Sequence, residues 1–531
     1  MALPLPPGID QSSLSQALQE CRDVVGDEWV FSSEQDVVLY RDAYTPFWDE
    51  EQDPLPSAAV APDTVEQVQD LIRIANRYQL PLWTISTGRN LGYGGSAPLL
   101  SGSVVLDLKR MNRVLEVNED NHYCVVEPGV SYFDLYRHIQ ERGLKVWIDP
   151  PDPGWGSPIG NSLDRGGGQT PMRDHFAAQC GMEVVLPNGE LMRTGMGAIP
   201  DGKTWQQYKY GFGPYIDGMF SQSNFGVVTK MGVWLYPEPE AFLSGTLSLA
   251  KRDDVHEYVR ILSYLVNSGI VQGTAGISSP LVNAISASED PQIRALFAHF
   301  GDPVVPVELE RFAEQSGLPF WSSTELRFYG PTKVIEAQWE YAQQRFAVIP
   351  GVEFQPGRSF QFPLSDEDLA EIVDPVFLGV PSLQIFRGQT GHMFFSPIIP
   401  MTGEAVLEVH RVLSNALEEM GLDAADYPTI ALPQSFYPRC FLILLVFRIP
   451  EDVEINRKNR EIFKQLVKVA ADHGWGEYRT HTAFMDDVMG AFSFNNHALL
   501  RFHETVKDAV DPNGILSPGK SGIWPKKFRN A

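Results

Sequence analysis

Three glycine-rich segments interrupt the N-terminal half of the chain and limit what this half can fold into. Residues 86–95 read STGRNLGYGG, residues 157–168 read SPIGNSLDRGGG and residues 221–229 read SQSNFGVVT. Backbone N–H groups can converge on a pyrophosphate only where few Cβ atoms intervene. One such loop can be an ordinary turn. Three of them within one β-rich region predict a single extended ligand that passes along the backbone.

The first of these loops differs from two common nucleotide-binding motifs. It follows a strand-like run but lacks the GxGxxG spacing, and no long helix opens after it. It is also not a Walker A loop, because no Lys-Ser or Lys-Thr pair follows it. The sequence therefore favours a different type of phosphate-binding fold.

Hydrophobic periodicity divides the chain near residue 240. Residues 64–79 have apolar side chains at helical spacing after a capping threonine, and short β-rich runs follow, including a hairpin around Pro187-Asn188-Gly189. After residue 240 the pattern becomes α+β. We expect helices at 253–267, 404–420 and about 455–473, a strand at 440–447, and a fixed loop at 511–522.

Composition excludes several classes of function. The formal net charge of -25 disfavours binding to nucleic acid or to anionic membranes. The four cysteines form no CxxC pair, so neither a disulfide framework nor a zinc site is expected. The first residues do not read as a signal peptide, and the longest apolar run, residues 440–447, is too short to span a bilayer. We expect a soluble cytoplasmic protein without a metal site.

Long motifs along nearly the whole chain resemble the vanillyl-alcohol oxidase family of FAD enzymes. They are the first glycine-rich loop, PGVSYFDL at 128–135, GMEVVLPNGELMRTGMG at 181–197, YGFGPYIDGMFSQSNFGVVTKMGVWL at 210–235, GHMFFSP at 391–397, GWGEYRTH at 474–481 and DPNGILSPGKSGIWP at 511–525. The resemblance implies an α+β fold with a two-subdomain FAD-binding domain and a cap domain that binds substrate. We expect the FAD-binding domain at 1–240, with 491–531 returning to it, and the cap at 241–490.

The resemblance also implies which residues bind the cofactor. They are Ser86, Thr87, Gly88, Arg89, Asn90, Leu91, Ser157, Asn161, Asp164, Gly226, Val228 and Lys520. His392 taken alone is most simply a structural histidine, but in this family the histidine of the HxFFSP motif bonds to the 8α-methyl group of the flavin. The family prototype assists this bond with a histidine in an early segment. The corresponding residues 42–48, DAYTPFW, contain none.

Three residues match the group that binds the substrate phenolate in this family: Tyr93, Tyr478 and Arg479. Oxidation of a para-substituted phenol is easier from the phenolate, whose oxidation gives a neutral quinone methide. An arginine and hydroxyl donors stabilise that anion. Asp152 matches the family's catalytic aspartate and would accept a proton near the benzylic carbon; Asp149 is the neighbour that could be confused with it.

Other pocket positions differ from the family prototype. Gln169 stands where a tyrosine is expected near the substrate side chain, Ser396 could face the pocket, and residues 423–437 match little. An insertion linked to higher assembly is short here, at about 201–210, which favours a homodimer.

The resulting hypothesis is an oxidase that takes a hydride from the benzylic carbon of para-substituted phenols and reduces oxygen to hydrogen peroxide. The alternative is a para-alkylphenol dehydrogenase that passes electrons to a cytochrome. A phenol-binding flavoprotein without turnover is a third possibility. A hydroxy-acid oxidase on the same fold has no use for the phenolate group.

Overall fold

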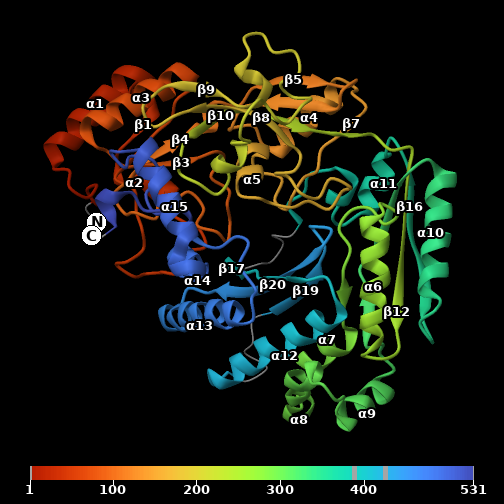
Figure 1. Cartoon of the computed structure of the whole chain (residues 1–531). Coiled ribbons are helices and arrows are strands. Elements are labelled where there is room, and N and C mark those ends of the chain that lie inside the picture. The colour runs from red at the N-terminus through yellow and green to blue at the C-terminus, as the bar shows by residue number, and fades with distance from the viewer. Residues whose placement is uncertain (1–2, 385–390, 423–428, 530–531) are drawn as a thin grey trace.

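The computed structural model describes residues 3–384, 391–422 and 429–529. In Figure 1 the N-terminal region, residues 3–240, lies above the central region, residues 241–484. The C-terminal segment, residues 485–529, returns to the N-terminal region, so the two ends of the chain lie close together. The three parts meet around the cavity described in the next subsection.

A small, mainly parallel sheet forms the first layer of the N-terminal region. Its central strands are buried along their length, as expected for strands that are covered on both faces. Helices α1 (Gln11–Val25) and α3 (Val65–Tyr78) pack together against it. The helix predicted at 64–79 is thus confirmed as α3, capped by Thr64, whose Oγ1 accepts a hydrogen bond from the Gln67 N–H at 3.2 Å. In spatial order the strands are β1 (Val30–Phe31), β2 (Ala58–Val60), β4 (Val104–Asp107) and β3 (Leu82–Ile85).

An antiparallel sheet forms the second layer of the N-terminal region. The predicted hairpin around residues 187–189 joins two of its strands. Helices α4 (Tyr132–Glu141) and α5 (Pro158–Leu163) contribute apolar side chains to its core. In spatial order the strands are β5 (Val114–Asn118), β6 (Tyr123–Val126), β10 (Val227–Trp234), β8 (Gln179–Val185) and β9 (Leu191–Arg193). A separate two-stranded pair, β7 (Val146–Trp147) and β11 (Tyr236–Pro237), leads towards the central region.

The central region contains two further sheets that share one hydrophobic core. The first is built on β12 (Ala241–Leu249), which pairs with three neighbours and begins immediately after the N-terminal region. Its other strands are β13 (Ile277–Ser278), β14 (Trp321–Ser323), β15 (Leu326–Gly330) and β16 (Glu353–Gln361).

The second central sheet carries His392. Its longest strand, β20 (Cys440–Ile449), confirms the strand predicted at 440–447. Figure 1 shows α12 and α13 running beside it. The other strands of the sheet are β17 (Gly391–Phe395), β18 (Ile398–Pro400) and β19 (Thr429–Gln434).

The helices predicted in the central region are confirmed. They form as α6 (Asp254–Asn267), α12 (Gly403–Glu419) and α13 (Val453–Asp472). The remaining helices are α2 (Glu34–Val37), α7 (Pro280–Ser286), α8 (Pro291–Arg294), α9 (Val307–Ser316), α10 (Thr332–Phe346), α11 (Asp366–Glu371), α14 (Met485–Ala491) and α15 (Phe494–Val510).

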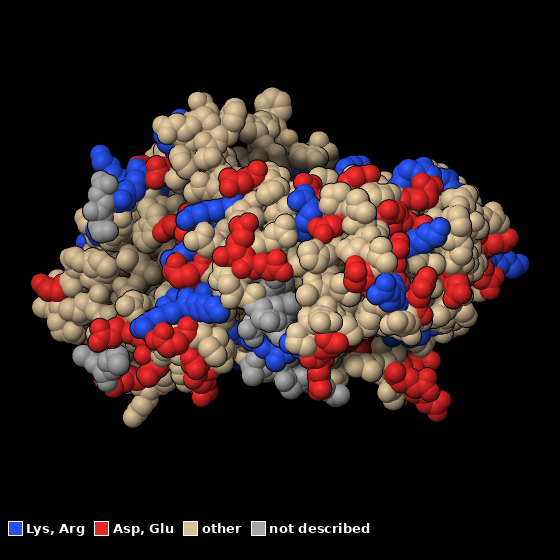
Figure 2. Space-filling model, turned by 90° about the horizontal axis from the view of Figure 1, so that it is seen from below, with Lys and Arg blue, Asp and Glu red and all other residues tan. Residues whose placement is uncertain are grey.

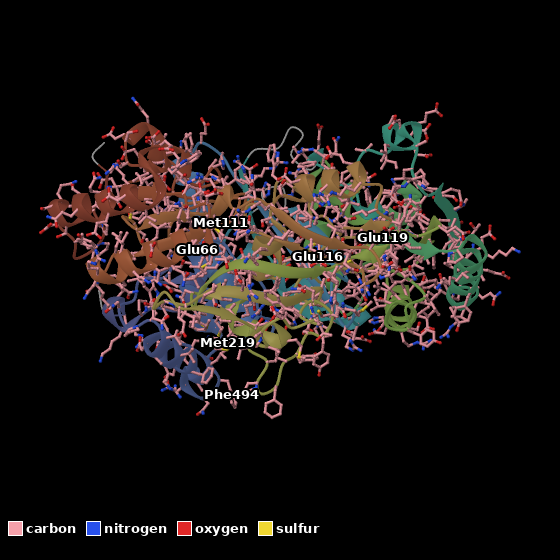
Figure 3. The ribbon with its side chains drawn as sticks, turned by 90° about the horizontal axis from the view of Figure 1, so that it is seen from above. Glu66, Met111, Glu116, Glu119, Met219 and Phe494 are labelled. Carbon is pink, nitrogen blue, oxygen red and sulfur yellow. The ribbon has the colours of Figure 1, made fainter. Side chains whose placement is uncertain are left out.

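The C-terminal segment completes the first sheet. The Leu82 N–H donates to the Ile515 carbonyl at 2.7 Å, and the Ser517 N–H donates to the Leu82 carbonyl at 2.7 Å, so this segment runs parallel to β3. Helix α15 lies on the outside, where Phe494 is 90% exposed (Figure 3). The fully buried Lys507 donates to the carbonyls of Asn224 and Leu516, each at 2.7 Å. The loop predicted at 511–522 is therefore fixed by hydrogen bonds on several sides.

The charged side chains and the helices can be compared with the composition of the chain. Figure 2 shows acidic side chains spread across one face among lysines and arginines, without a large basic patch on that face. None of the helices in the described ranges is long and apolar enough to cross a membrane.

Candidate active site

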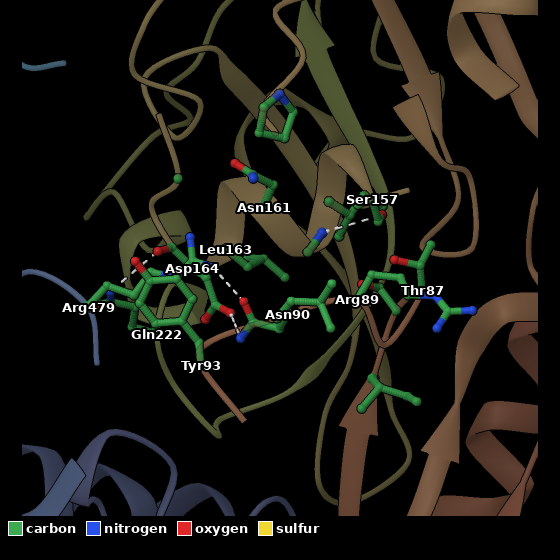
Figure 4. Close-up of a pocket in the computed structure, with 18 of the residues that line it drawn as sticks. Thr87, Arg89, Asn90, Tyr93, Ser157, Asn161, Leu163, Asp164, Gln222 and Arg479 are labelled. Carbon is green, nitrogen blue, oxygen red and sulfur yellow. Dashed lines mark hydrogen bonds between the residues drawn. The ribbon is translucent and has the colours of Figure 1, made fainter. Parts of the chain in front are cut away.

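A cavity of about 430 Å³ lies where the three glycine-rich segments, the central region and the C-terminal segment meet. All but one of the predicted site residues line it, and Figure 4 shows several of them converging. Those that line the cavity are Ser86, Thr87, Gly88, Arg89, Asn90, Leu91, Tyr93, Asp152, Ser157, Asn161, Asp164, Gln169, Gly226, Val228, His392, Tyr478, Arg479 and Lys520.

The glycines of the first loop adopt backbone conformations that other residues rarely reach. Gly88 has φ +66°, and a Cβ added there would lie 2.3 Å from Ser96 Oγ. Gly92 has φ +79°, and a Cβ there would lie 3.1 Å from the carbonyl oxygen of His392. At Gly88 a side chain would collide with its neighbour, and at Gly92 it would be crowded, so the loop packs closely against the segments beside it. Such a bare backbone wall fits the pyrophosphate of a dinucleotide cofactor.

Asp164 joins residues from four segments into one hydrogen-bonded chain. Lys520 Nζ lies 3.0 Å from its Oδ1, and Asn90 Nδ2 donates to its Oδ2 at 3.1 Å. Arg479 Nη2 in turn donates to Asn90 Oδ1 at 2.5 Å (Figure 4). Burial opposes ionisation of Asp164, but the charges of Lys520 and Arg479 outweigh it and lower the pKa of this carboxyl. The residues expected to bind the cofactor and those expected to bind the phenolate thus share one network.

Tyr93, Tyr478 and Arg479 form the predicted cluster. The Arg479 guanidinium carbon lies 3.9 Å from the centroid of the Tyr93 ring, a cation–π contact. Burial, assisted by Tyr478 and opposed by Arg479, raises the pKa of Tyr93 well above its ordinary value. Tyr93 therefore stays a neutral hydroxyl donor. Arg479 Nε is buried and has no hydrogen-bond partner among the described residues. A cation beside hydroxyl donors stabilises an oxyanion more than a neutral phenol.

Asp152 lies beside a second carboxyl, that of Asp374, which no sequence motif indicates. Burial, followed by the neighbouring Asp374, raises the pKa of Asp152 to about 7. The loop that follows Asp374 contacts the Asp152 loop, because the Gly154 N–H donates to the Ser382 carbonyl at 2.9 Å. Asp152 Oδ1 is buried without a hydrogen-bond partner in the part of the chain that the structure describes. A carboxyl that titrates near neutrality suits the exchange of a proton with a ligand.

His392 lies on β17 opposite Arg448 of β20 and is 5% exposed. Its ring contacts two aromatic rings, Tyr44 with centroids 5.0 Å apart and Phe394 with centroids 4.7 Å apart. Tyr44 belongs to the early segment 42–48 that lacks a histidine. The structure brings a histidine to this segment from elsewhere: His481 Nε2 lies 2.7 Å from Asp42 Oδ2, and both side chains are buried.

The remaining predicted pocket residues differ in their placement. Gln169 lines the cavity, and its Oε1 accepts a hydrogen bond from Arg327 at 3.0 Å. Ser396 is fully buried and does not line the cavity, and its N–H donates to Glu477 Oε1 at 2.7 Å. Burial raises the pKa of Glu477 well above its ordinary value, against the effect of this hydrogen bond. Nothing in the sequence distinguished Glu477 or Asp374 from ordinary acidic residues.

Two other sequence expectations concern the cap side and metals. Residues 423–428 lie outside the described residues, whereas Gln434, Phe436 and Tyr437 of the same segment line the cavity. Within the described residues, no cluster of three or more His, Cys, Asp or Glu side chains is arranged to hold a metal ion.

Two family models match the chain. The model described as an FAD binding domain matches residues 56–195, and that for the C-terminal domain of FAD linked oxidases matches residues 379–521. A curated relative, the 4-cresol dehydrogenase (hydroxylating) flavoprotein subunit of Pseudomonas putida, is 35% identical over 528 residues, which cover 98% of this chain and 97% of the relative. The chain belongs to the vanillyl-alcohol oxidase/p-cresol methylhydroxylase family.

Solved structures of this family share the whole fold. The 4-ethylphenol oxidase of Gulosibacter chungangensis matches with a TM-score of 0.83 and 34% identity, covering 99% of this chain and 100% of that one. The p-cresol methylhydroxylase matches with a TM-score of 0.82 and 33% identity, covering 98% of this chain and 99% of that one. The predicted α+β flavoenzyme fold is confirmed. As a member of the family, this chain is an FAD-dependent oxidoreductase.

The fit of the glycine-lined wall to FAD generates a prediction for Gly88. Gly88→Ala should reduce the flavin content of the purified protein, because alanine at φ +66° costs about 1–2 kcal/mol and its methyl group collides with Ser96. The ratio of flavin to protein absorbance measures this. Gly490→Ala, in α14 with no atom within 4 Å of the added Cβ, is the control and should keep full flavin. Equal flavin content in both variants would contradict the assignment.

Proposed function

We propose that this protein is an oxidase of para-substituted phenols, which it binds as phenolates beside Tyr93, Tyr478 and Arg479. The observation that carries the proposal is the position of the Arg479 guanidinium, stacked on Tyr93 and hydrogen-bonded to Asn90 within the cavity. Relatives named for 4-ethylphenol and for 4-cresol support the same substrate class.

Arg479 and the two tyrosines prepare the substrate for oxidation. A free phenol has a pKa of about 10 and is almost entirely neutral at pH 7. A guanidinium and two hydroxyl donors at the phenol oxygen favour loss of its proton. FAD, when bound, accepts a hydride from the benzylic carbon. The phenolate that loses this hydride becomes a neutral quinone methide, so no carbocation has to be stabilised.

Asp152 accepts the proton that is released in the second half of the reaction. Water that adds to the quinone methide loses a proton as its oxygen bonds to the benzylic carbon, and the ring oxygen regains its negative charge. Asp152, with its buried Oδ1, is placed in the cavity to accept that proton when it is ionised. When the substrate is a benzylic alcohol, the same carboxylate accepts the hydroxyl proton and the product is the aldehyde.

Oxygen is proposed as the electron acceptor, and reduced cofactor and oxygen together yield hydrogen peroxide. The similarity to the 4-ethylphenol oxidase supports oxygen as the acceptor. The similarity to the 4-cresol dehydrogenase subunit instead supports the alternative, which is transfer to a cytochrome. Assembly as a homodimer and a cytoplasmic location stay predictions from the sequence.

The substrate and the acceptor are tested in one experiment. Anaerobic 4-ethylphenol should bleach the flavin absorbance, and air should restore it at least as fast as the enzyme turns over, with formation of peroxide. The control 4-ethylanisole has no ionisable phenol and should leave the flavin oxidised. Flavin that stays oxidised with 4-ethylphenol and with vanillyl alcohol would contradict phenol oxidation. Reoxidation slower than turnover would instead favour the dehydrogenase.

A covalent bond between His392 and the 8α position of FAD is proposed as well. The imidazole is held on a strand between Tyr44 and Phe394, beside the first glycine-rich loop. We expect acid precipitation to leave a yellow protein pellet, and His392→Ala to release the colour into the supernatant. Yellow colour found wholly in the supernatant of the unmodified protein would exclude the bond.

The raised pKa of Asp152 predicts a pH dependence. Asp152 is neutral below about pH 7 and charged above it, so oxidation of 4-hydroxybenzyl alcohol should fall as the pH drops through about 7. Asp374→Asn removes the neighbouring charge and should move this fall to lower pH, although burial, the larger cause, keeps part of the shift. Profiles of kcat/KM against pH measure both effects. Asp366→Asn, on the exposed start of α11, is the control, and an acid limb unmoved in Asp374→Asn would contradict the pairing.

A further inference from the structure

The buried residues Asp149 and His175 lie together directly behind the cavity wall. Neither residue lines the cavity, and they are 5% and 3% exposed. His175 Nε2 lies 3.3 Å from Asp149 Oδ2. The proposed reaction uses neither residue, yet a buried carboxylate beside an imidazole is costly unless its hydrogen bonds are well defined.

The other side of the His175 ring, at Nδ1, contacts a residue of the cavity wall. His175 Nδ1 lies 2.5 Å from Oδ1 of Asn161, which lines the cavity wall (Figure 4). Asp149 is itself oriented, because its Oδ1 accepts the Thr170 N–H at 3.1 Å. Asp149, His175 and Asn161 thus form a row that runs from the protein interior to the cofactor cavity.

The chemistry of the row determines how the Asn161 amide is oriented. An amide oxygen can only accept, so His175 Nδ1 donates to Asn161 Oδ1, while the Asp149 carboxylate lies on the other side of the ring, 3.3 Å from Nε2. Other titratable neighbours are Tyr132, whose Oη lies 3.4 Å from Nδ1, and Arg173 and Tyr329, which both interact with Asp149. With its oxygen held by His175, Asn161 presents its amide N–H groups to the cavity.

The glycines at 166–168 give independent support for this row. A Cβ added to Gly166 would lie 1.9 Å from Asn161 Oδ1, and one added to Gly168 would lie 2.1 Å from Asp149 Oδ1. Both ends of the row therefore pass against backbone where only glycine fits. These glycines make room for polar side chains behind the wall, which is a different role from that of Gly88.

We propose that Asp149 and His175 are positioning residues that hold the Asn161 amide with its N–H groups directed at FAD. The inference depends on binding of FAD and not on the identity of the substrate or of the electron acceptor. Failure of the phenol experiment would therefore leave it intact.

The test measures FAD affinity in the full chain that carries His392→Ala, so that the cofactor exchanges whether or not the wild-type protein bonds to it. Asp149→Asn keeps the shape of the side chain but removes the negative charge that lies 3.3 Å from the His175 ring and helps to orient it towards Asn161. We expect FAD affinity to fall about fivefold to tenfold, the value of one hydrogen bond. Asn161→Ala should cause a similar loss, and Asp149→Asn added to Asn161→Ala should cause no further loss.

Controls separate positioning from a general loss of stability. His175→Gln keeps a polar group if a larger change at this site prevents folding, and thermal unfolding of each apoprotein reports its stability. His410→Gln changes a buried histidine of the central region between Phe297 and Phe300, and FAD affinity should not change. An unchanged affinity in Asp149→Asn would overturn the proposal. The same loss in the Asn161→Ala background would also overturn it, because Asp149 would then act through packing alone.

Discussion

The carboxylate of Asp164 is the interaction on which the geometry of the site depends. It holds Lys520 of the C-terminal segment and Asn90 of the first glycine-rich loop, and Asn90 holds Arg479. Two cations therefore lie near one another only because an anion separates them, and the low pKa of Asp164 shows that their attraction exceeds the cost of its burial. The residues expected to bind the cofactor and those expected to bind the phenolate cannot be positioned independently, since one network orients both.

The fold was largely predictable from the sequence because its elements are periodic. Helix α3 has apolar side chains at helical spacing, strand β20 is a continuous apolar run, and the hairpin between β8 and β9 has a strong turn signal. The cavity-lining residues were accessible because they lie in contiguous motifs. Asp374 was not accessible, because its effect comes from burial and from a neighbour distant in sequence, and Glu477, although it lies within GWGEYRTH, gives no sign in the sequence that it is buried. A single acidic residue in a loop carries no periodic or spacing signal.

The early segment, residues 42–48, shows a further limit of predicting a site from the linear sequence. Residues 42–48 contain no histidine, and the sequence alone indicates that an interaction has been lost. In three dimensions His481 reaches Asp42, and Asp42 Oδ1 also accepts the Tyr44 N–H at 3.0 Å. A histidine is thus present beside residues 42–48, but it comes from the C-terminal part of the chain. Ser396 shows the converse, since it belongs to a motif that contributes residues to the cavity but does not itself line the cavity.

The return of the C-terminal segment sets an order of events during synthesis. Residues 515–517 extend the first sheet beside Leu82, and Lys520 closes the network of Asp164. Domains generally fold as they leave the ribosome, beginning with the N-terminal parts. Here the first sheet is complete only after residues 515–517 have been translated, by which point the central region already has the sequence for its own core. The site expected to bind the flavin is therefore complete only after Lys520 has been translated, and a chain that stalled before residue 515 would lack both the segment beside Leu82 and the partner of Asp164.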